Sequence, residues 1–119
     1  MASQRILVAE DDPSVRLTIQ FVLEDEGFEV LLAADGQEAL DLAMAAHPDA
    51  ILLDQMMPKM DGKEVLAAIR AEASTEATPV LVLTGMARGA PEDWPGAHFI
   101  GKPFSPEFLV ERLMALLGS

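Results

Sequence analysis

The residue of greatest chemical interest is Asp54, which directly follows the apolar run from Ile51 to Leu53. An apolar run without polar alternation is typical of a strand that is buried on both faces of a parallel sheet. Asp54 would then lie at the carboxyl end of this strand, the edge of an open α/β sheet at which ligands bind. Asp54 by itself is compatible with a reactive carboxylate or with a solvated acid at the end of a strand.

Four other polar side chains follow other predicted strands: Glu10 and Asp11 follow the first, Thr84 the fourth and Lys102 the fifth. In a parallel sheet all of them would collect at the same edge as Asp54. Three carboxylates at this separation repel one another and raise each other's pKa values, and a bound cation relieves that repulsion. Because the ligands are oxygens, without His or Cys, a hard ion such as Mg²⁺ is favoured.

These groups together would make a workable phosphoryl-acceptor site. The Asp54 carboxylate would attack in line, while Mg²⁺ and the Lys102 ammonium would neutralise charge on the transferring group. The Thr84 hydroxyl is a further donor for a phosphoryl oxygen.

Apolar runs and helix signals alternate along the whole chain. The runs predict five strands, at residues 5–9, 28–33, 50–53, 80–83 and 97–101. Capping residues and apolar stripes predict helices at 13–26, 36–46, 62 to about 73, and from 106 onward, with Asp12, Asp61 and Ser105 as N-caps. Strands that alternate with helices favour a parallel sheet with right-handed crossovers, in one α/β domain that spans residues 1–119.

The composition narrows the class of protein. A chain of 119 residues, 50% of them hydrophobic, can build one domain with a core but not two. The formal net charge of -12 argues against direct binding of nucleic acid, because such binding depends on basic residues at phosphates. The absence of cysteine excludes disulfides and thiolate metal sites. With no leader sequence and no long apolar run, we expect a cytoplasmic protein without a membrane segment.

In sequence order, the motifs resemble those of receiver domains of bacterial two-component response regulators, and the resemblance covers essentially the whole chain. The motifs are the acidic cluster after the first strand, Asp54-x-x-Met57-Pro58-x-Met60-Asp61-Gly62, Thr84-Gly85 and Lys102-Pro103-Phe104. The resemblance implies a doubly wound five-stranded parallel sheet of order 2-1-3-4-5, the flavodoxin-like fold.

The resemblance also implies how the acidic residues act. Asp54 is the phosphorylated aspartate, and Mg²⁺ is bound directly by Asp11 and largely through water by Glu10. The backbone carbonyl of Met56 supplies a further oxygen to the metal, whereas Asp12 serves as a helix cap.

The same resemblance assigns the residues that hold and report the phosphoryl group. The Thr84 hydroxyl and the Lys102 ammonium hold phosphoryl oxygens, and the bond between Lys102 and Pro103 is usually cis in the family. Phe99 matches the aromatic residue whose swing reports phosphorylation, although it could also be an ordinary core aromatic.

By this resemblance the chain is a signalling module that catalyses only its own phosphorylation and dephosphorylation. The donor is a phosphohistidine on a histidine kinase or a histidine phosphotransfer protein. Because no output domain is attached in this sequence, we expect a separate partner protein to read the phosphorylated state. Leu17 and Phe21, on the outer face of the first helix, match the place where family members dock their donors, but they could equally be ordinary exposed apolar residues.

One segment departs from the family pattern. Between the strands that end at Thr84 and Gly101, family members carry a full helix, but here residues 85–96 include three glycines and two prolines. We therefore expect this fourth helix to be shortened to about one turn or absent, and we expect the protein to remain a monomer. Trp94 in this segment is either a lid over a small hydrophobic cluster or a partner contact.

Two other functions on this fold were weighed against the signalling module. An aspartate-nucleophile phosphatase usually needs a second acid two residues after the nucleophile, where this chain has Met56. An FMN protein needs a Ser/Thr/Gly-rich phosphate loop after the first strand, where this chain has Glu10, Asp11 and Asp12. A receiver-like scaffold that is never phosphorylated is disfavoured by the intact set of site residues.

Overall fold

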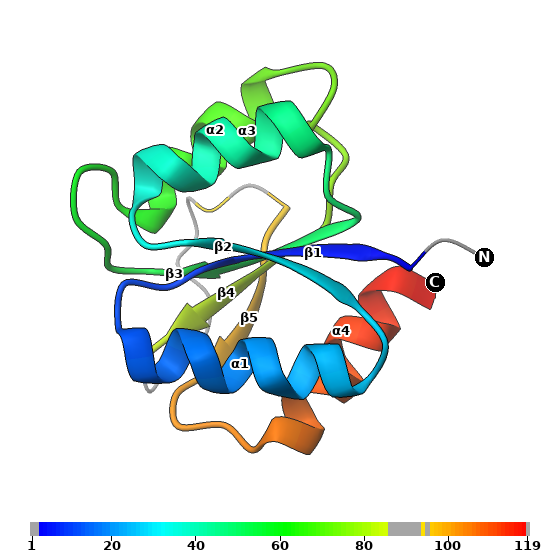
Figure 1. Ribbon diagram of the computed structural model, residues 1–119. Helices are drawn as coiled ribbons and strands as arrows, with labels where there is room; N and C mark the ends of the chain where they lie inside the picture. Colours follow the sequence, from blue (N-terminus) through cyan, green and yellow to red (C-terminus); the bar gives the residue numbers. More distant parts are fainter. Residues whose placement is uncertain (1–2, 86–93, 95, 119) are drawn as a thin grey trace.

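The computed structural model describes residues 3–85, 94 and 96–118, and within them five strands form one sheet between two layers of helices (Figure 1). Helices α2 and α3 cover one face of the sheet, and α1 and α4 cover the other (Figure 1). The elements are β1 (Arg5–Ala9), α1 (Pro13–Asp25), β2 (Glu29–Ala33), α2 (Gly36–Ala46), β3 (Ala50–Asp54), α3 (Gly62–Ala71), β4 (Val80–Thr84), β5 (His98–Gly101) and α4 (Pro106–Gly118).

The sheet is parallel throughout and has the order β2-β1-β3-β4-β5, which confirms the predicted doubly wound fold. β1 and β3 are neighbours, with Ala9 opposite Leu53, and β4 and β5 are neighbours, with Thr84 opposite Gly101. The carboxyl ends of these four strands therefore meet at one edge, and the residues that follow them are brought together there.

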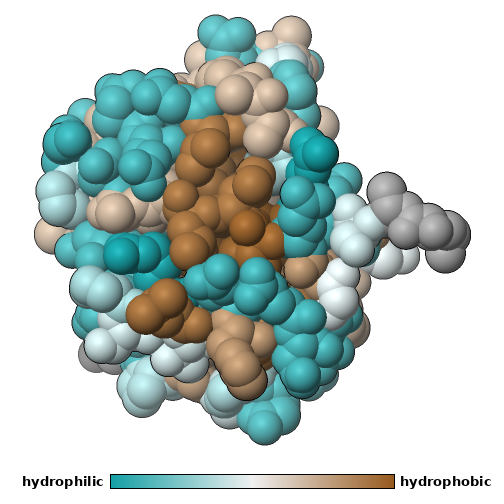
Figure 2. All heavy atoms as spheres, viewed as in Figure 1, coloured by the Kyte–Doolittle hydropathy of each residue, from teal (hydrophilic) through white to brown (hydrophobic). Residues whose placement is uncertain are grey.

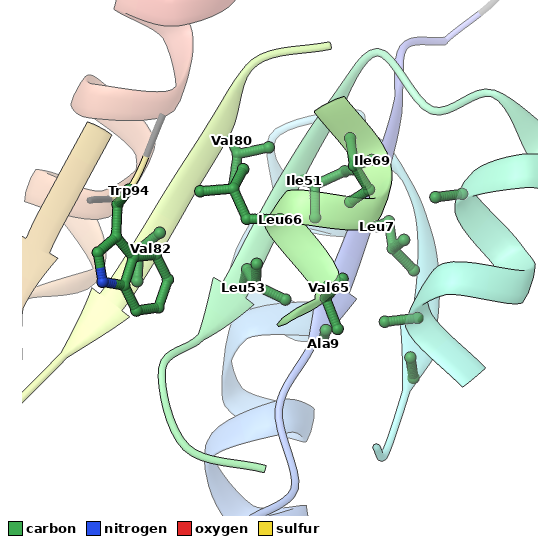
Figure 3. Close-up of a cluster of buried hydrophobic side chains, with 13 residues drawn as sticks. Leu7, Ala9, Ile51, Leu53, Val65, Leu66, Ile69, Val80, Val82 and Trp94 are labelled. Carbon is green, nitrogen blue, oxygen red and sulfur yellow. The ribbon is translucent and has the colours of Figure 1, made fainter. Parts of the chain in front are cut away.

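Alternate residues of each central strand enter two separate cores, as expected for a sheet that is buried on both faces. On the α2 and α3 side, Val65, Leu66 and Ile69 of α3 pack onto the sheet (Figure 3). The opposite core contains the other strand residues with apolar residues of α1 and α4, such as Ile19 and Leu113. The strand β3 is buried along its whole length, which explains why its sequence shows no polar alternation.

The predicted helix caps are confirmed. Asp12 accepts hydrogen bonds from the backbone N–H groups of Ser14 and Val15, at 2.9 and 3.5 Å, and so begins α1. Asp61 and Glu64 form a reciprocal capping box at the start of α3. These caps satisfy backbone donors that have no partner within the helix and so fix the point where each helix leaves the functional edge of the sheet.

The helix α3 ends at Ala71, earlier than the predicted end at about Ala73. The backbone turns extended at Glu72, and the buried Thr75 hydroxyl donates a 2.8 Å hydrogen bond to the carbonyl of Ile69. This bond satisfies a carbonyl of the last helical turn, and so stops the helix where the sequence pattern alone would continue it. At five other elements the bounds differ from the prediction by one residue. The helix α1 ends at Asp25, the strands β2 and β5 begin at Glu29 and His98, and the strands β3 and β4 end at Asp54 and Thr84.

The described residues contain four helices, none of them between β4 and β5. The sequence predicts at most one helical turn within residues 85–96, and this segment lies outside the described residues apart from Gly85, Trp94 and Gly96. No helix in the described part of the chain has both the length and the apolar character needed to cross a membrane.

Apolar side chains gather at the centre of the face in Figure 2, where β2 forms the edge of the sheet, and the middle residues of β2 are half-buried.

Candidate functional site

Three carboxylates meet at the carboxyl edge of the sheet. Glu10 and Asp11 follow β1, Asp54 ends the adjacent strand β3, and one carboxylate oxygen from each lies within 4.8 Å of the others. Glu10 and Asp54 are buried, at 1% and 5% exposed, whereas Asp11 is exposed. The predicted cluster therefore exists, with two carboxylates at its base and one at its solvent side.

The ammonium of Lys102 lies against the two buried carboxylates. Its Nζ is 3.1 Å from Oδ1 of Asp54 and 3.4 Å from Oε2 of Glu10. Its backbone N–H donates a 2.7 Å hydrogen bond to the carbonyl of Thr84, which fixes the start of the connection after β5 on the end of β4. The bond between Lys102 and Pro103 is cis.

The pKa values at this cluster show how strongly its groups interact. Burial, followed by the hydrogen bond and charge of Asp54, raises the pKa of Glu10 to about 7, although Lys102 opposes the rise. The pKa of Asp11 is also raised, for the same reasons of desolvation and the proximity of Asp54. Burial acts to lower the pKa of Lys102, but its hydrogen bonds and ion pairs with Asp54 and Glu10 prevail, and the pKa is raised.

These observations fit a divalent cation. The donors are oxygens alone, as hard cations prefer, and three carboxylates within 4.8 Å make an excess of negative charge that one ammonium only partly offsets. A cation would favour the ionised forms of Glu10 and Asp11, whose pKa values are raised by burial and by Asp54. The site residues therefore fit Mg²⁺.

Thr84 ends β4 next to this cluster and is itself buried. Its hydroxyl donates a 2.6 Å hydrogen bond to Oε1 of Gln55, the residue after Asp54. Gln55 was not among the residues that the sequence indicated. Its proximity to Thr84 depends on the pairing of β3 with β4, in which Asp54 lies opposite Leu83.

Of the remaining predicted residues, Met56 lies next to the cluster and Phe99 lies on β5. The backbone N–H of Met56 approaches Oδ1 of Asp54 at 3.5 Å, and the Met56 side chain is exposed. Phe99 is half-buried on β5, and its ring meets Trp94 edge-on, at 5.7 Å between centroids and an interplanar angle of 71°. Trp94 is buried against the same core as α3, which is the position expected of a lid over a hydrophobic cluster (Figure 3).

Several further residues are exposed. His47 and His98 are exposed. Leu17 and Phe21 are exposed on α1, at 59% and 74%. An added Cβ on Gly85, next to Thr84, would meet no described atom within 4 Å.

Comparisons with known proteins agree with this geometry. The family model of the response regulator receiver domain matches residues 6–114. Response regulator MprA of Mycolicibacterium vanbaalenii is 43% identical over 117 residues, which are 95% of this chain and 50% of that protein. MprA of Mycobacterium tuberculosis is 42% identical over 119 residues, which are 97% of this chain and 51% of that protein. The chain thus spans about half the length of these relatives.

Solved structures of similar proteins cover the whole domain. Chemotaxis protein CheY4 of Vibrio cholerae superposes with a TM-score of 0.88 at 36% identity, covering 98% of this chain and 100% of that one. The receiver domain of sensor histidine kinase PA1611 from Pseudomonas aeruginosa, which holds a magnesium ion in its active site cleft, gives a TM-score of 0.92 at 32% identity. That match covers 99% of this chain and 100% of the other. Fold, family match and identity to relatives together show that this chain belongs to the response regulator receiver domains, the signalling domains of two-component systems.

Proposed function

We propose that Asp54 accepts a phosphoryl group from a phosphohistidine and that the phosphorylated state is the signal. The observation that carries this proposal is the position of the Lys102 ammonium, 3.1 Å from Asp54 Oδ1 at the edge of a carboxylate cluster. A cation held at the acceptor oxygen can interact with a transferring phosphoryl group without a rearrangement of the fold.

In the transfer step, a carboxylate oxygen of Asp54 forms a bond to phosphorus while the bond from phosphorus to the donor imidazole nitrogen breaks. Glu10, Asp11, Asp54 and the carbonyl of Met56 are the residues that would hold Mg²⁺, which supplies neutralisation of phosphoryl charge when bound. The ammonium of Lys102 holds one phosphoryl oxygen and the Thr84 hydroxyl holds another. Both groups lie at the ends of neighbouring strands, so they can face the same acceptor.

Phe99 is proposed to transmit the change at Thr84. It lies on β5, the neighbour of β4, and its half-buried ring packs edge-on against Trp94. A movement of the Thr84 side chain toward the phosphoryl group alters the space beside β5, and the Phe99 ring can fill that space. The packing of Trp94 would then change with the state of the site.

The donor is proposed to dock beside α1. A groove lies next to Lys102 between α1 and the connection from β5 to α4, and its lining is largely apolar, with Val15, Ile19 and Phe104 among its residues. Leu17 and Phe21 add exposed apolar surface on the same helix. A helix of a histidine kinase or phosphotransfer protein placed here brings its phosphohistidine to the acceptor edge, and a separate partner protein would read the result.

The test is phosphorylation by acetyl phosphate with Mg²⁺, followed by intact mass measurement. The protein should gain one phosphoryl group, and Asp54→Asn should gain none. Asp41→Asn, which changes an exposed carboxylate on α2, is the matched control and should be labelled like the parent. Equal labelling of Asp54→Asn would refute the acceptor, and no labelling of the parent by acetyl phosphate or a phosphohistidine donor would leave a receiver-like scaffold that does not depend on phosphorylation.

A further inference from the structure

The side chain of Gln55 accepts a hydrogen bond from the hydroxyl of Thr84. The Thr84 Oγ1 atom donates to Gln55 Oε1 at 2.6 Å, a short hydrogen bond between the residue that follows β3 and the last residue of β4. The bond is partly shielded from water, because Thr84 is only 6% exposed and Gln55 is half-buried. A shielded hydrogen bond of this length has to be broken before the hydroxyl proton can serve another acceptor.

The backbone of Gln55 is fixed on both sides. Its N–H donates to the carbonyl of Leu83 at 3.1 Å, and its carbonyl accepts from the N–H of Gly62 at 3.0 Å. Gly62 allows this approach, because a Cβ there would lie 2.5 Å from the carbonyl oxygen of Asp54 and 3.1 Å from the Cα of Gln55. The Gln55 amide is therefore presented to Thr84 from a rigid base formed by β4 and the start of α3.

A threonine hydroxyl carries a single proton to donate. A phosphoryl oxygen and the amide oxygen of Gln55 are both acceptors, so they compete for that proton. From this competition we infer that Gln55 is a positioning residue, a latch that holds Thr84 in the unphosphorylated arrangement. The inference rests on the proposed function in one respect, the role of Thr84 in holding a phosphoryl oxygen.

The latch sets how readily Thr84 moves to hold a phosphoryl group. It does not take part in the phosphoryl transfer to Asp54. A charged phosphoryl oxygen is a stronger acceptor than an amide, so the exchange can proceed once the group is present. The hydrogen bond to Gln55 stabilises only the resting arrangement, and its removal should shift the balance toward the phosphoryl-bound arrangement.

The experiment is a titration of the protein with beryllofluoride, a phosphoryl mimic, in the presence of Mg²⁺, followed by two-dimensional NMR. Gln55→Met keeps an unbranched side chain of similar length but removes the acceptor. It should lower the half-saturating concentration by about 2- to 10-fold, the range expected when one neutral hydrogen bond is lost from the resting state alone. Gln55→Ala should change it in the same direction, and Gln37→Met, on exposed α2, is the matched control that should not change it.

A double-mutant cycle separates the latch from a general effect on packing. In a Thr84→Ala background, Gln55→Met should have no further effect, because the donor of the hydrogen bond is gone. An unchanged or weakened response in Gln55→Met, or an equal gain in the Thr84→Ala background, would overturn the latch while leaving the proposed function intact. A parent protein that neither binds beryllofluoride nor is labelled at Asp54 would overturn both.

Discussion

Nζ of Lys102 lies 3.1 Å from Oδ1 of Asp54, although 48 positions separate the two residues in the sequence. The contact results from the strand order, because β3, β4 and β5 are successive neighbours and their carboxyl ends meet. The backbone N–H of Lys102 donates a 2.7 Å hydrogen bond to the carbonyl of Thr84. This bond holds in place the backbone from which the Lys102 side chain extends. Asp54, the proposed acceptor, and the Lys102 ammonium that balances its charge are thus positioned by the sheet itself.

Replacement of Lys102 should separate metal binding from the response to a phosphoryl group. In Lys102→Ala the carboxylates of Glu10, Asp11 and Asp54 all remain, so Mg²⁺ should still raise the melting temperature. The response to beryllofluoride should be lost or greatly weakened, because the ammonium is needed once the mimic is present. Lys59→Ala, which removes an exposed ion pair with Asp35, is the control and should keep both responses. Loss of the Mg²⁺ effect in Lys102→Ala would contradict the division of roles.

Asp11 and Asp12 are adjacent carboxylates with different predicted roles. Asp11→Ala should abolish most of the Mg²⁺-dependent rise in melting temperature, because it removes a ligand of the cluster. Asp12→Ala should lower stability by about 1 kcal/mol through loss of the α1 cap and yet keep the full Mg²⁺-dependent rise. Thermal unfolding with and without Mg²⁺ measures both effects. If Asp11→Ala responds to Mg²⁺ like the parent, Asp11 is not a principal ligand.

The signal is expected to leave the domain without formation of a dimer. Many receivers pair through three elements: the helix and the strand that follow the strand ending in the site threonine, and the last helix. In this chain, the three glycines and two prolines of residues 85–96 predict that no stable helix forms there. A specific dimer normally buries more than about 1,000 Å² in total, which the remaining elements would have to supply alone. Light scattering at micromolar concentration, with and without beryllofluoride and Mg²⁺, should show a monomer throughout, and a beryllofluoride-dependent dimer would contradict this expectation.

The fold could be predicted because the residues that indicate it, the helix caps and the apolar runs of the strands, are close together in the sequence. Asp12, Asp61 and Ser105 cap helices that begin where the sequence placed them, and the apolar runs became strands of the expected order. The site followed from the fold, since Glu10 and Asp54 come together once β1 and β3 are adjacent. The role of Glu10 in holding Mg²⁺ and the role of Asp54 as phosphoryl acceptor stay predictions.

The features that the sequence did not indicate depend on tertiary contacts. Gln55 meets Thr84 only through the register of β3 against β4. Thr75 lies in the polar segment after α3, and its side chain turns inward to donate a hydrogen bond to the carbonyl of Ile69. The burial of Trp94 depends on the position of Phe99 on β5, which local sequence does not determine. Polar and irregular segments therefore carried the least reliable sequence signal.

The stability of the metal-free protein should fall as pH rises from about 4.5 to about 7. The pKa of Glu10 is about 7 in the folded protein against 4.5 for an ordinary glutamate, so the folded state holds this proton more tightly than the unfolded state. The stabilisation is complete below pH 4.5 and lost above pH 7. At about 1.4 kcal/mol per pKa unit it amounts to at most about 3 kcal/mol. The raised pKa of Asp11 acts in the same direction.

Urea unfolding at pH 5 and pH 8, without Mg²⁺, measures this dependence. Glu10→Gln should flatten it, because the amide does not titrate, whereas Glu111→Gln, an exposed change on α4, should leave it as in the parent. Saturating Mg²⁺ should reduce the difference between the two pH values in the parent, because a cation favours the ionised carboxylates and so stabilises the protein more at pH 8. An equal pH dependence in the parent and in Glu10→Gln would show that the buried carboxylate does not hold its proton near neutral pH.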